Sequence, residues 1–118
     1  MIAHIVLFEP KADLSQPQKL AFAQSVIETC RSIETVKRIS LGRRVDVDPG
    51  YARSLGDSTY KYAAVLEFES ANGLVSYLND PKHEVLGRLF WQYCERALIS
   101  EVEWIDVGDA DAASKLAF

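Results

Sequence analysis

Two residues near the middle of this chain are suited to acid–base chemistry. His83 ends the segment Asp80-Pro81-Lys82-His83 and falls in the first turn of an expected helix. The partial positive charge of a helix N-terminus disfavours a protonated imidazole, and a general base must be neutral. Tyr77, six residues earlier, carries a hydroxyl that can donate to a developing oxyanion. The alternatives are an ordinary surface histidine and a core tyrosine with a satisfied hydroxyl.

The second histidine, His4, lies in the middle of residues 2–9, an expected strand rich in β-branched and aromatic residues. Alternation places His4 on the same strand face as Val6 and Phe8. If that face meets the helices, the imidazole points into the space between sheet and helices. The alternative is a neutral core histidine with one satisfied hydrogen bond, since buried polar groups are normally paired.

Other reactive side chains carry weaker signals. Tyr60 and Tyr62 share one face of a later strand, either as core residues or as hydroxyl donors. The chain has no Gly-rich phosphate loop, nucleophile elbow, CxxC or HExxH motif, and no cluster of metal ligands. We therefore expect neither a bound metal nor a bound cofactor. Cys30 and Cys94 both fall in helical patterns, which favours buried thiols.

Length and charge exclude several classes of protein. The chain has 118 residues, which fits a single domain, and a net charge of −4. A mildly acidic chain is not typical of nucleic-acid binders. No stretch approaches the roughly 20 apolar residues of a membrane helix, and residue 1 leads directly into a strand pattern without a signal peptide. We expect a cytoplasmic protein without nucleic-acid or membrane partners.

The elements that would position these side chains follow the order β-α-β-β-α-β. We expect strands at 2–9, 36–45, 60–68 and 97–105 and helices at 15–33, 71–78 and 81–96. The first helix should bury one stripe, formed by Leu20, Ala23, Val26, Ile27, Cys30 and Ile33. The polar segment 46–59 is expected to be a long loop of functional or mobile character.

This element order predicts an α+β, ferredoxin-like fold, with one antiparallel sheet and the helices on one face. The other face of a solvated sheet should be polar, yet Ile5, Leu7, Ala63 and Val65 make it apolar. We therefore expect a homodimer whose two sheets pack face to face into a barrel. The alternative is a monomer with the tail, residues 107–118, folded over that face.

Three segments resemble the stress-responsive A/B barrel domain (Dabb) family, of the dimeric α/β-barrel superfamily. They are residues 1–8 (MIAHIVLF), 64–70 (AVLEFES) and 77–83 (YLNDPKH). The resemblance covers residues 1–106, which we expect to form the domain, and leaves the tail outside. It implies a ferredoxin-like fold, a dimeric barrel, and a pocket between sheet and helices in each subunit.

The family resemblance also implies a set of site residues. Its best-understood members are plant polyketide cyclases, which close a ring by aldol chemistry with His and Tyr. By that resemblance His83 is the base, Tyr77 orients it, and His4 holds a substrate oxygen. Tyr62 stands where those enzymes carry a further histidine on the third strand. We expect substrate contacts from four pocket residues, Tyr62, Phe8, Leu86 and Phe90.

Two functional hypotheses follow from this set of residues. The first is a cofactor-free enzyme acting as an aldol-type cyclase, isomerase or lyase on a small molecule. The second is a non-catalytic or stress-related dimer that binds an apolar small molecule in the same pocket. A relationship to haem-handling proteins or quinol monooxygenases would depend on shared fold alone.

Overall fold

The structure is a computed structural model, and it describes residues 1–48, 50, 56 and 58–117. Its elements, in chain order, are β1 (Ile2–Pro10), α1 (Gln16–Arg31), β2 (Arg38–Arg43), β3 (Tyr62–Phe68), α3 (Ala71–Leu78), α4 (Pro81–Tyr93), β4 (Cys94–Glu103) and α5 (Ala112–Leu116). The predicted β-α-β-β-α-β order is confirmed, with the second helical unit divided into α3 and α4.

Local sequence signals explain where the helices begin. The Ser15 hydroxyl accepts a hydrogen bond from the Gln18 backbone, and the Gln18 side chain accepts one from the Ser15 backbone, which completes a capping box for α1. Asp80 caps α4 in the same way by accepting from the Lys82 backbone, and Pro81 occupies the first helical position. This cap separates α3 from α4 and places His83 in the first turn of α4.

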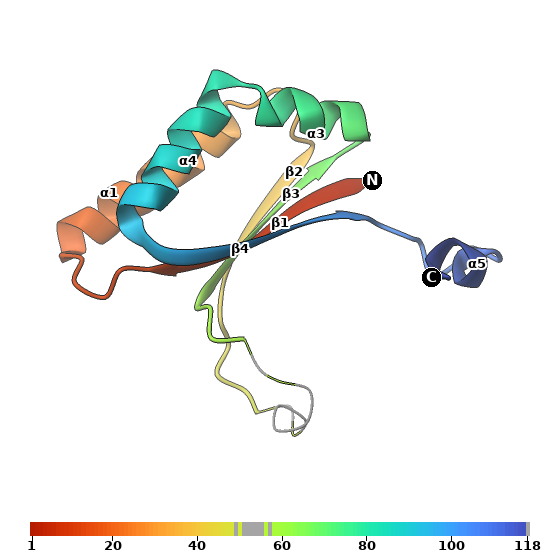
Figure 1. Cartoon of the computed structure of the whole chain (residues 1–118), viewed down its shortest axis with the longest axis horizontal. Coiled ribbons are helices and arrows are strands. Elements are labelled where there is room, and N and C mark those ends of the chain that lie inside the picture. Colours follow the sequence, from red (N-terminus) through yellow and green to blue (C-terminus); the bar gives the residue numbers. More distant parts are fainter. Residues whose placement is uncertain (49, 51–55, 57, 118) are drawn as a thin grey trace.

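The four strands form one antiparallel sheet in the order β2-β3-β1-β4. Helices α1, α3 and α4 cover one face of this sheet, and α1 packs beside α4 (Figure 1). The predicted ferredoxin-like α+β fold is confirmed. Because β1 is a central strand, His4 lies directly between Leu66 of β3 and Glu101 of β4.

The core lies between the sheet and the helices, and Phe68 is its largest fully buried side chain. The predicted stripe of α1 is wrong in part: Leu20 is 60% exposed and Ala23 is exposed, whereas Phe22 is only 5% exposed. Phe22, Val26 and Cys30 repeat every four residues and form the buried stripe. The aromatic ring of Phe22 removes more apolar surface from water than Leu20 and Ala23 would, so it sets the rotation of the helix.

Some predicted boundaries shift at the ends of elements. Cys94 is the first residue of β4 and not part of a helix, so its helical assignment is wrong. The chain is already extended there because Cys94 pairs with Pro10 across a register shift at the end of β1. Both cysteines are nevertheless buried and free, as expected.

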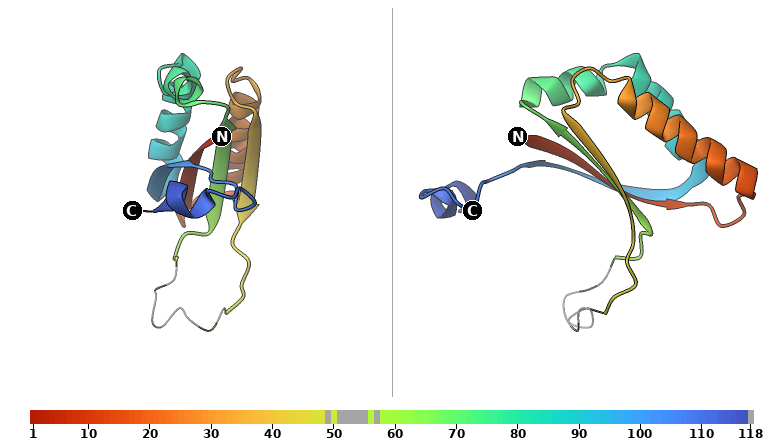
Figure 2. Two further views of the ribbon diagram at one scale, coloured as in Figure 1. Left: turned by 90° about the vertical axis from the view of Figure 1, so that its right-hand side faces the viewer. Right: turned by 180° about the vertical axis from the view of Figure 1, so that it is seen from behind.

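The sheet face away from the helices carries apolar side chains at half-buried or exposed positions. Ile5, Leu7 and Val65 are half-buried, and Leu98 beside Leu7 is 55% exposed. The tail includes α5 and projects away from the sheet instead of covering this face, as the alternative of a monomer would require (Figures 1 and 2). The expected loop 46–59 falls partly on residues 49, 51–55 and 57, which lie outside the described residues.

Candidate functional site

A small cavity between the sheet and α4 contains all three residues expected to be catalytic. We call this site of about 100 Å³ the histidine cavity. It is lined mainly by apolar side chains, which surround His4, Tyr77 and His83; the other lining residues are Val6, Val26, Cys30, Ala64, Leu66, Leu86, Gly87, Phe90, Ala97 and Ile99. A volume of this size holds a reacting group or a few water molecules, but not a whole drug-sized ligand.

Three separate elements bring the reactive rings together. The ring centroids of Tyr77 and His83 are 4.9 Å apart, those of His4 and Tyr77 are 5.5 Å apart, and those of the two histidines are 6.5 Å apart. All three pairs meet edge to face. β1 contributes His4, α3 contributes Tyr77 and the first turn of α4 contributes His83, so the site forms only when these elements pack together.

A carboxylate that the sequence analysis missed controls the orientation of His4. Nδ1 of His4, which is 4% exposed, lies 2.7 Å from Oε1 of Glu101 on the neighbouring strand. Since a carboxylate only accepts hydrogen bonds, the proton of a neutral His4 stands on Nδ1, and Nε2 is the unprotonated nitrogen. The signal in the sequence is a glutamate within an expected strand, but only the strand register places it opposite His4.

Tyr77 is suited to donate a hydrogen bond and not to remove a proton. It is 3% exposed, and burial, aided by Cys30 and the charge of Glu101, raises the pKa of its hydroxyl far above the ordinary value. The hydroxyl therefore keeps its proton throughout the neutral range. It makes no hydrogen bond with the described part of the chain and is available to a ligand in the cavity.

His83 connects the histidine cavity with the surface. It is half-buried and lines both the cavity and a shallow depression beside the exposed Trp91. Gly87 borders the same two spaces, and a Cβ atom there would meet nothing within 4 Å. A base in this position can take a proton inside the cavity and exchange it with solvent.

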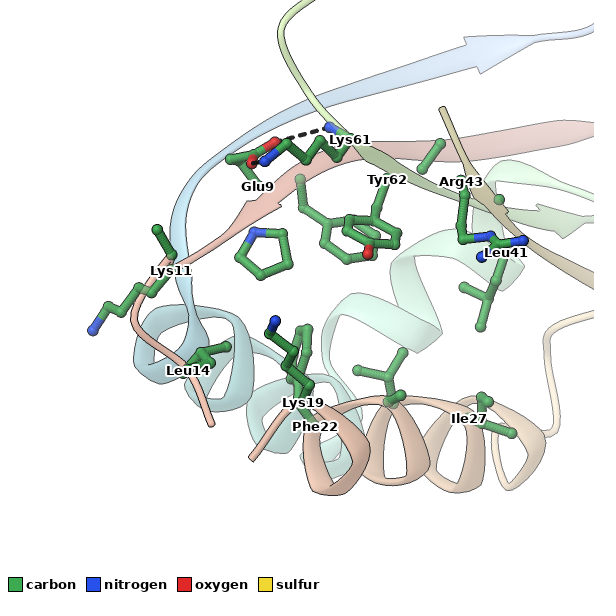
Figure 3. Close-up of a pocket in the computed structure, with 17 residues that line it drawn as sticks. Glu9, Lys11, Leu14, Lys19, Phe22, Ile27, Leu41, Arg43, Lys61 and Tyr62 are labelled. Carbon is green, nitrogen blue, oxygen red and sulfur yellow. Dashed lines mark hydrogen bonds and ion pairs between the residues drawn. The ribbon is translucent and has the colours of Figure 1, made fainter. Parts of the chain in front are cut away.

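A larger pocket lies beside the histidine cavity, between α1 and the β2–β3 edge of the sheet. We call this space of about 540 Å³ the outer pocket (Figure 3). Phe8 and Tyr62, two of the expected substrate-binding residues, line this pocket. Their rings stack with the centroids 5.6 Å apart. The other two, Leu86 and Phe90, line the histidine cavity. The four residues are thus divided between two adjacent spaces, and Val26 lines both.

An aromatic cluster separates these two spaces. Phe8 meets Phe90 at 5.0 Å between ring centroids, and Phe22 meets Phe90 at 5.5 Å. Edge-to-face contacts at these distances are favourable packing arrangements for aromatic rings. Phe22 is a further lining residue that the sequence analysis left out, because the predicted α1 stripe included Leu20 and Ala23 in its place.

Over the ranges that the structure describes, no group of three or more His, Cys, Asp or Glu side chains could hold a metal ion. Nor is any helix within those ranges long and apolar enough to cross a bilayer.

The structure is a ferredoxin-like α+β domain with two adjacent spaces between sheet and helices. The model of the stress responsive A/B barrel domain family matches residues 2–104, and the chain belongs to this family. The resemblance inferred from three short segments is thereby confirmed. A sequence search of curated proteins finds no match.

Solved structures share the fold at low sequence identity. A protein from Arabidopsis thaliana has a TM-score of 0.75 at 18% identity, covering 92% of this chain and 99% of its own. A hydroxynitrile lyase from Passiflora edulis has a TM-score of 0.68 at 19% identity, covering 86% and 90%. A dimeric ferredoxin-like protein of unknown function from Bacteroides fragilis has a TM-score of 0.62 at 23% identity, covering 87% and 95%.

Proposed function

We propose that this protein is a small-molecule enzyme that moves a proton with His83 as general base. The observation that carries the proposal is the meeting of His4, Tyr77 and His83 around one largely apolar cavity. Polar groups that converge in an apolar space are the usual mark of a binding or catalytic site. Neither the Tyr77 hydroxyl nor the His83 imidazole has a hydrogen-bond partner among the described residues.

The three side chains have complementary roles in such a reaction. His83 removes a proton from a carbon next to a carbonyl group, and the electrons of the broken C–H bond move onto the carbonyl oxygen. Tyr77, whose raised pKa keeps it protonated, donates a hydrogen bond to that oxygen as its charge develops. His4, held by Glu101, binds a second substrate oxygen. The enolate then reacts, and the proton on His83 is returned or exchanged.

Two chemistries of this kind are open to the site. One is carbon–carbon bond formation or isomerisation through the enolate. The other is the lyase chemistry named for the Passiflora edulis protein, in which a base takes the hydroxyl proton of a cyanohydrin while the bond to cyanide breaks and cyanide leaves. Both need one base and one hydrogen-bond donor at an oxygen, and His83 with Tyr77 supplies that pair.

The test is an assay that does not require the natural substrate. The protein would be incubated in D₂O with a panel of aryl ketones and β-keto acids, and deuterium at the carbon next to the carbonyl followed by NMR. Mandelonitrile would be assayed in parallel for release of benzaldehyde. Exchange or cleavage above the buffer rate, lost in His83→Gln, supports the proposal. Activity that survives in His83→Gln contradicts it.

The second candidate is a protein that binds a small molecule without converting it. The outer pocket favours this alternative, because most of its volume lies away from His83 and it contains no histidine. A binder should hold its ligand equally well when His83 and His4 are both changed to Gln. An enzyme should lose turnover in the same variant.

We also propose that two copies form a barrel through the apolar sheet faces. This interface would bury Ile5, Leu7, Val65 and Leu98, because monomers rarely expose a large contiguous apolar surface to water. The dimeric description of the Bacteroides fragilis protein supports this arrangement. Light scattering should give twice the chain mass of 13.2 kDa. Val65→Glu should give monomers, whereas Val85→Glu on the exposed side of α4 should not.

Burial of two unpaired thiols supports a cytoplasmic location for the protein. Cys30 and Cys94 are both free, and reducing compartments keep cysteines in this state. Fractionation of cells that express the tagged chain tests this placement, and recovery in an oxidising compartment would contradict it.

A further inference from the structure

The outer pocket has an unusual charge composition for this protein. Four basic side chains line it: Lys11, Lys19, Arg43 and Lys61. Among the residues that the structure describes, Glu9 is the only acidic side chain in the lining. The chain as a whole carries 17 acidic and 13 basic residues, so the lining opposes the overall charge. A cavity with apolar walls that is lined by charges of one sign favours ligands of the opposite charge.

Two of the four cations are free to meet a ligand. Lys61 is paired with Glu9 at 3.3 Å, and the amine of Lys11 points away from the pocket (Figure 3). Lys19 and Arg43 have no ion pair or hydrogen bond with any described side chain. Lys19 comes from α1 and Arg43 from β2, and they lie on opposite walls of the pocket, so each can meet an anion at its own part of the rim (Figure 3).

The interior of the outer pocket is apolar and aromatic. Phe8 and Tyr62 stack on each other with an interplanar angle of 20°, and Phe22 stands edge-on to Phe8. The volume of about 540 Å³ lies within the roughly 300–1,000 Å³ range of small-molecule sites. Apart from the Tyr62 hydroxyl, the side chains named here are apolar, and they suit a flat ring system or an acyl chain.

We infer that the outer pocket binds an apolar carboxylic acid, with its carboxylate at Lys19 or Arg43 on the basic rim and its apolar body on Phe8 and Tyr62. This inference names a substrate class, so its relevance to catalysis rests on the proposed function. The binding itself is independent of turnover. The wall at Val26 borders both spaces, which places the reacting group of such a substrate next to the histidine cavity.

The first test compares two probes of equal shape. The carboxylate 2-naphthoate and the neutral 2-naphthamide would be titrated by calorimetry at low and high salt. The naphthoate should bind about tenfold tighter than the naphthamide, which is at the low end of the effect expected for a charge-assisted hydrogen bond. The difference in affinity should shrink as the salt concentration rises. Equal affinities, or no naphthoate binding up to about 1 mM, would overturn the inference.

The second test removes the two free cations. In the double variant Lys19→Gln/Arg43→Gln the preference for naphthoate over naphthamide should disappear, while naphthamide affinity stays the same. Arg31→Gln is the matched control, since Arg31 is an exposed cation on α1 that lines neither cavity. An unchanged preference in the double variant, or an equal loss in Arg31→Gln, would overturn the inference.

The third test locates the ligand. Ala23 on α1 lines the outer pocket, and Ala23→Trp should fill the mouth and abolish naphthoate binding. Ala21→Trp, at an exposed position outside the pocket, should leave it unchanged. His83→Gln should bind naphthoate normally, so a failure of catalysis there is distinguishable from a failure of binding. Undiminished binding in Ala23→Trp contradicts the assignment of the site.

Discussion

The histidine cavity and the outer pocket share one wall but differ in almost every physical property. The first encloses about 100 Å³ and brings three reactive rings within 6.5 Å of one another. The second is about five times larger, holds no histidine and has a basic rim. Reactive groups need fixed geometry and little water, whereas binding needs area and complementary charge. A small domain can thus place its reactive groups in one cavity and its ligand-binding surface in another.

The cause of this separation is the packing of the helices on the sheet. α4 packs closely on the β1–β4 side and supplies His83, Leu86 and Phe90 to the histidine cavity. α1 leaves space beside the C-terminal end of β1 and the N-terminal end of β3, and Phe8, Phe22 and Tyr62 are the aromatic residues that line this space in the described part of the chain.

The largest effect is expected at His83. His83→Gln keeps the size and polarity of the side chain but removes the base, so turnover should fall by about 10²–10⁴-fold. Binding of 2-naphthoate should not change. Deuterium exchange and calorimetry on the same preparation measure the two quantities. The control is Glu84→Gln, the next residue of α4, and a similar loss of turnover there would mean that His83 is not special.

A somewhat smaller effect is expected at Tyr77. Tyr77→Phe removes a donor at the developing oxyanion and should lower turnover by about 10²–10³-fold. The free energy of unfolding should hardly change, because the hydroxyl has no partner in the described part of the chain. Steady-state kinetics and urea unfolding make the comparison. Tyr93→Phe, whose ring lines neither cavity, should leave turnover intact.

A modest effect is expected at Glu101, which acts through His4. Glu101→Gln replaces the carboxylate that fixes the proton on Nδ1, and the loss of a charge-assisted hydrogen bond should lower turnover by about tenfold. Binding of 2-naphthoate should stay the same, which a general loss of structure would not allow. Glu103→Gln, two residues along β4, serves as the control. Unchanged turnover in Glu101→Gln would remove the positioning role.

The smallest effect concerns the buried thiol of the histidine cavity. Burial raises the pKa of Cys30 to about 11, above its ordinary value of 9.0, so the folded state holds the proton more tightly than the unfolded state. The contribution of Cys30 to stability is therefore complete below pH 9 and is lost as the pH rises toward 11.

Urea unfolding of the wild type and of Cys30→Ala measures this contribution. The stability difference between them should shrink by on the order of 1 kcal/mol over that window. Cys94→Ala should behave alike, because burial also raises the pKa of Cys94 to about 11. A difference that stays constant up to pH 11 would show that Cys30 is not shielded as the structure implies.

Local patterns accounted for most of the fold. Ser15 with Gln18, and Asp80 with Pro81, marked the starts of α1 and α4 because capping depends on residues a few positions apart. The strand face of His4 followed from alternation in the same way. The stripe of α1 did not, because Leu20 and Phe22 both fit a helical period and only packing decides between them.

The residues of the candidate site divide along the same line. The identities of His4, Tyr77 and His83 as the groups suited to acid–base work came from residue type and from a resemblance to a family. That Glu101 orients His4 depends on a pairing between residues 97 positions apart, which no local pattern encodes. The basic rim of the outer pocket likewise combines side chains from α1, from β2, from the residue after β1 and from the residue before β3, which meet only after folding.

The order of elements, the helix starts and the apolar second face of the sheet could be predicted from the sequence, because each depends on residues close together along the chain. The reactive side chains could be named from residue type. Which of these side chains meet, how far apart they lie and what charge surrounds each cavity could be read only from the folded structure. Those properties depend on strand register and helix rotation, which are set by the packing of distant segments against one another.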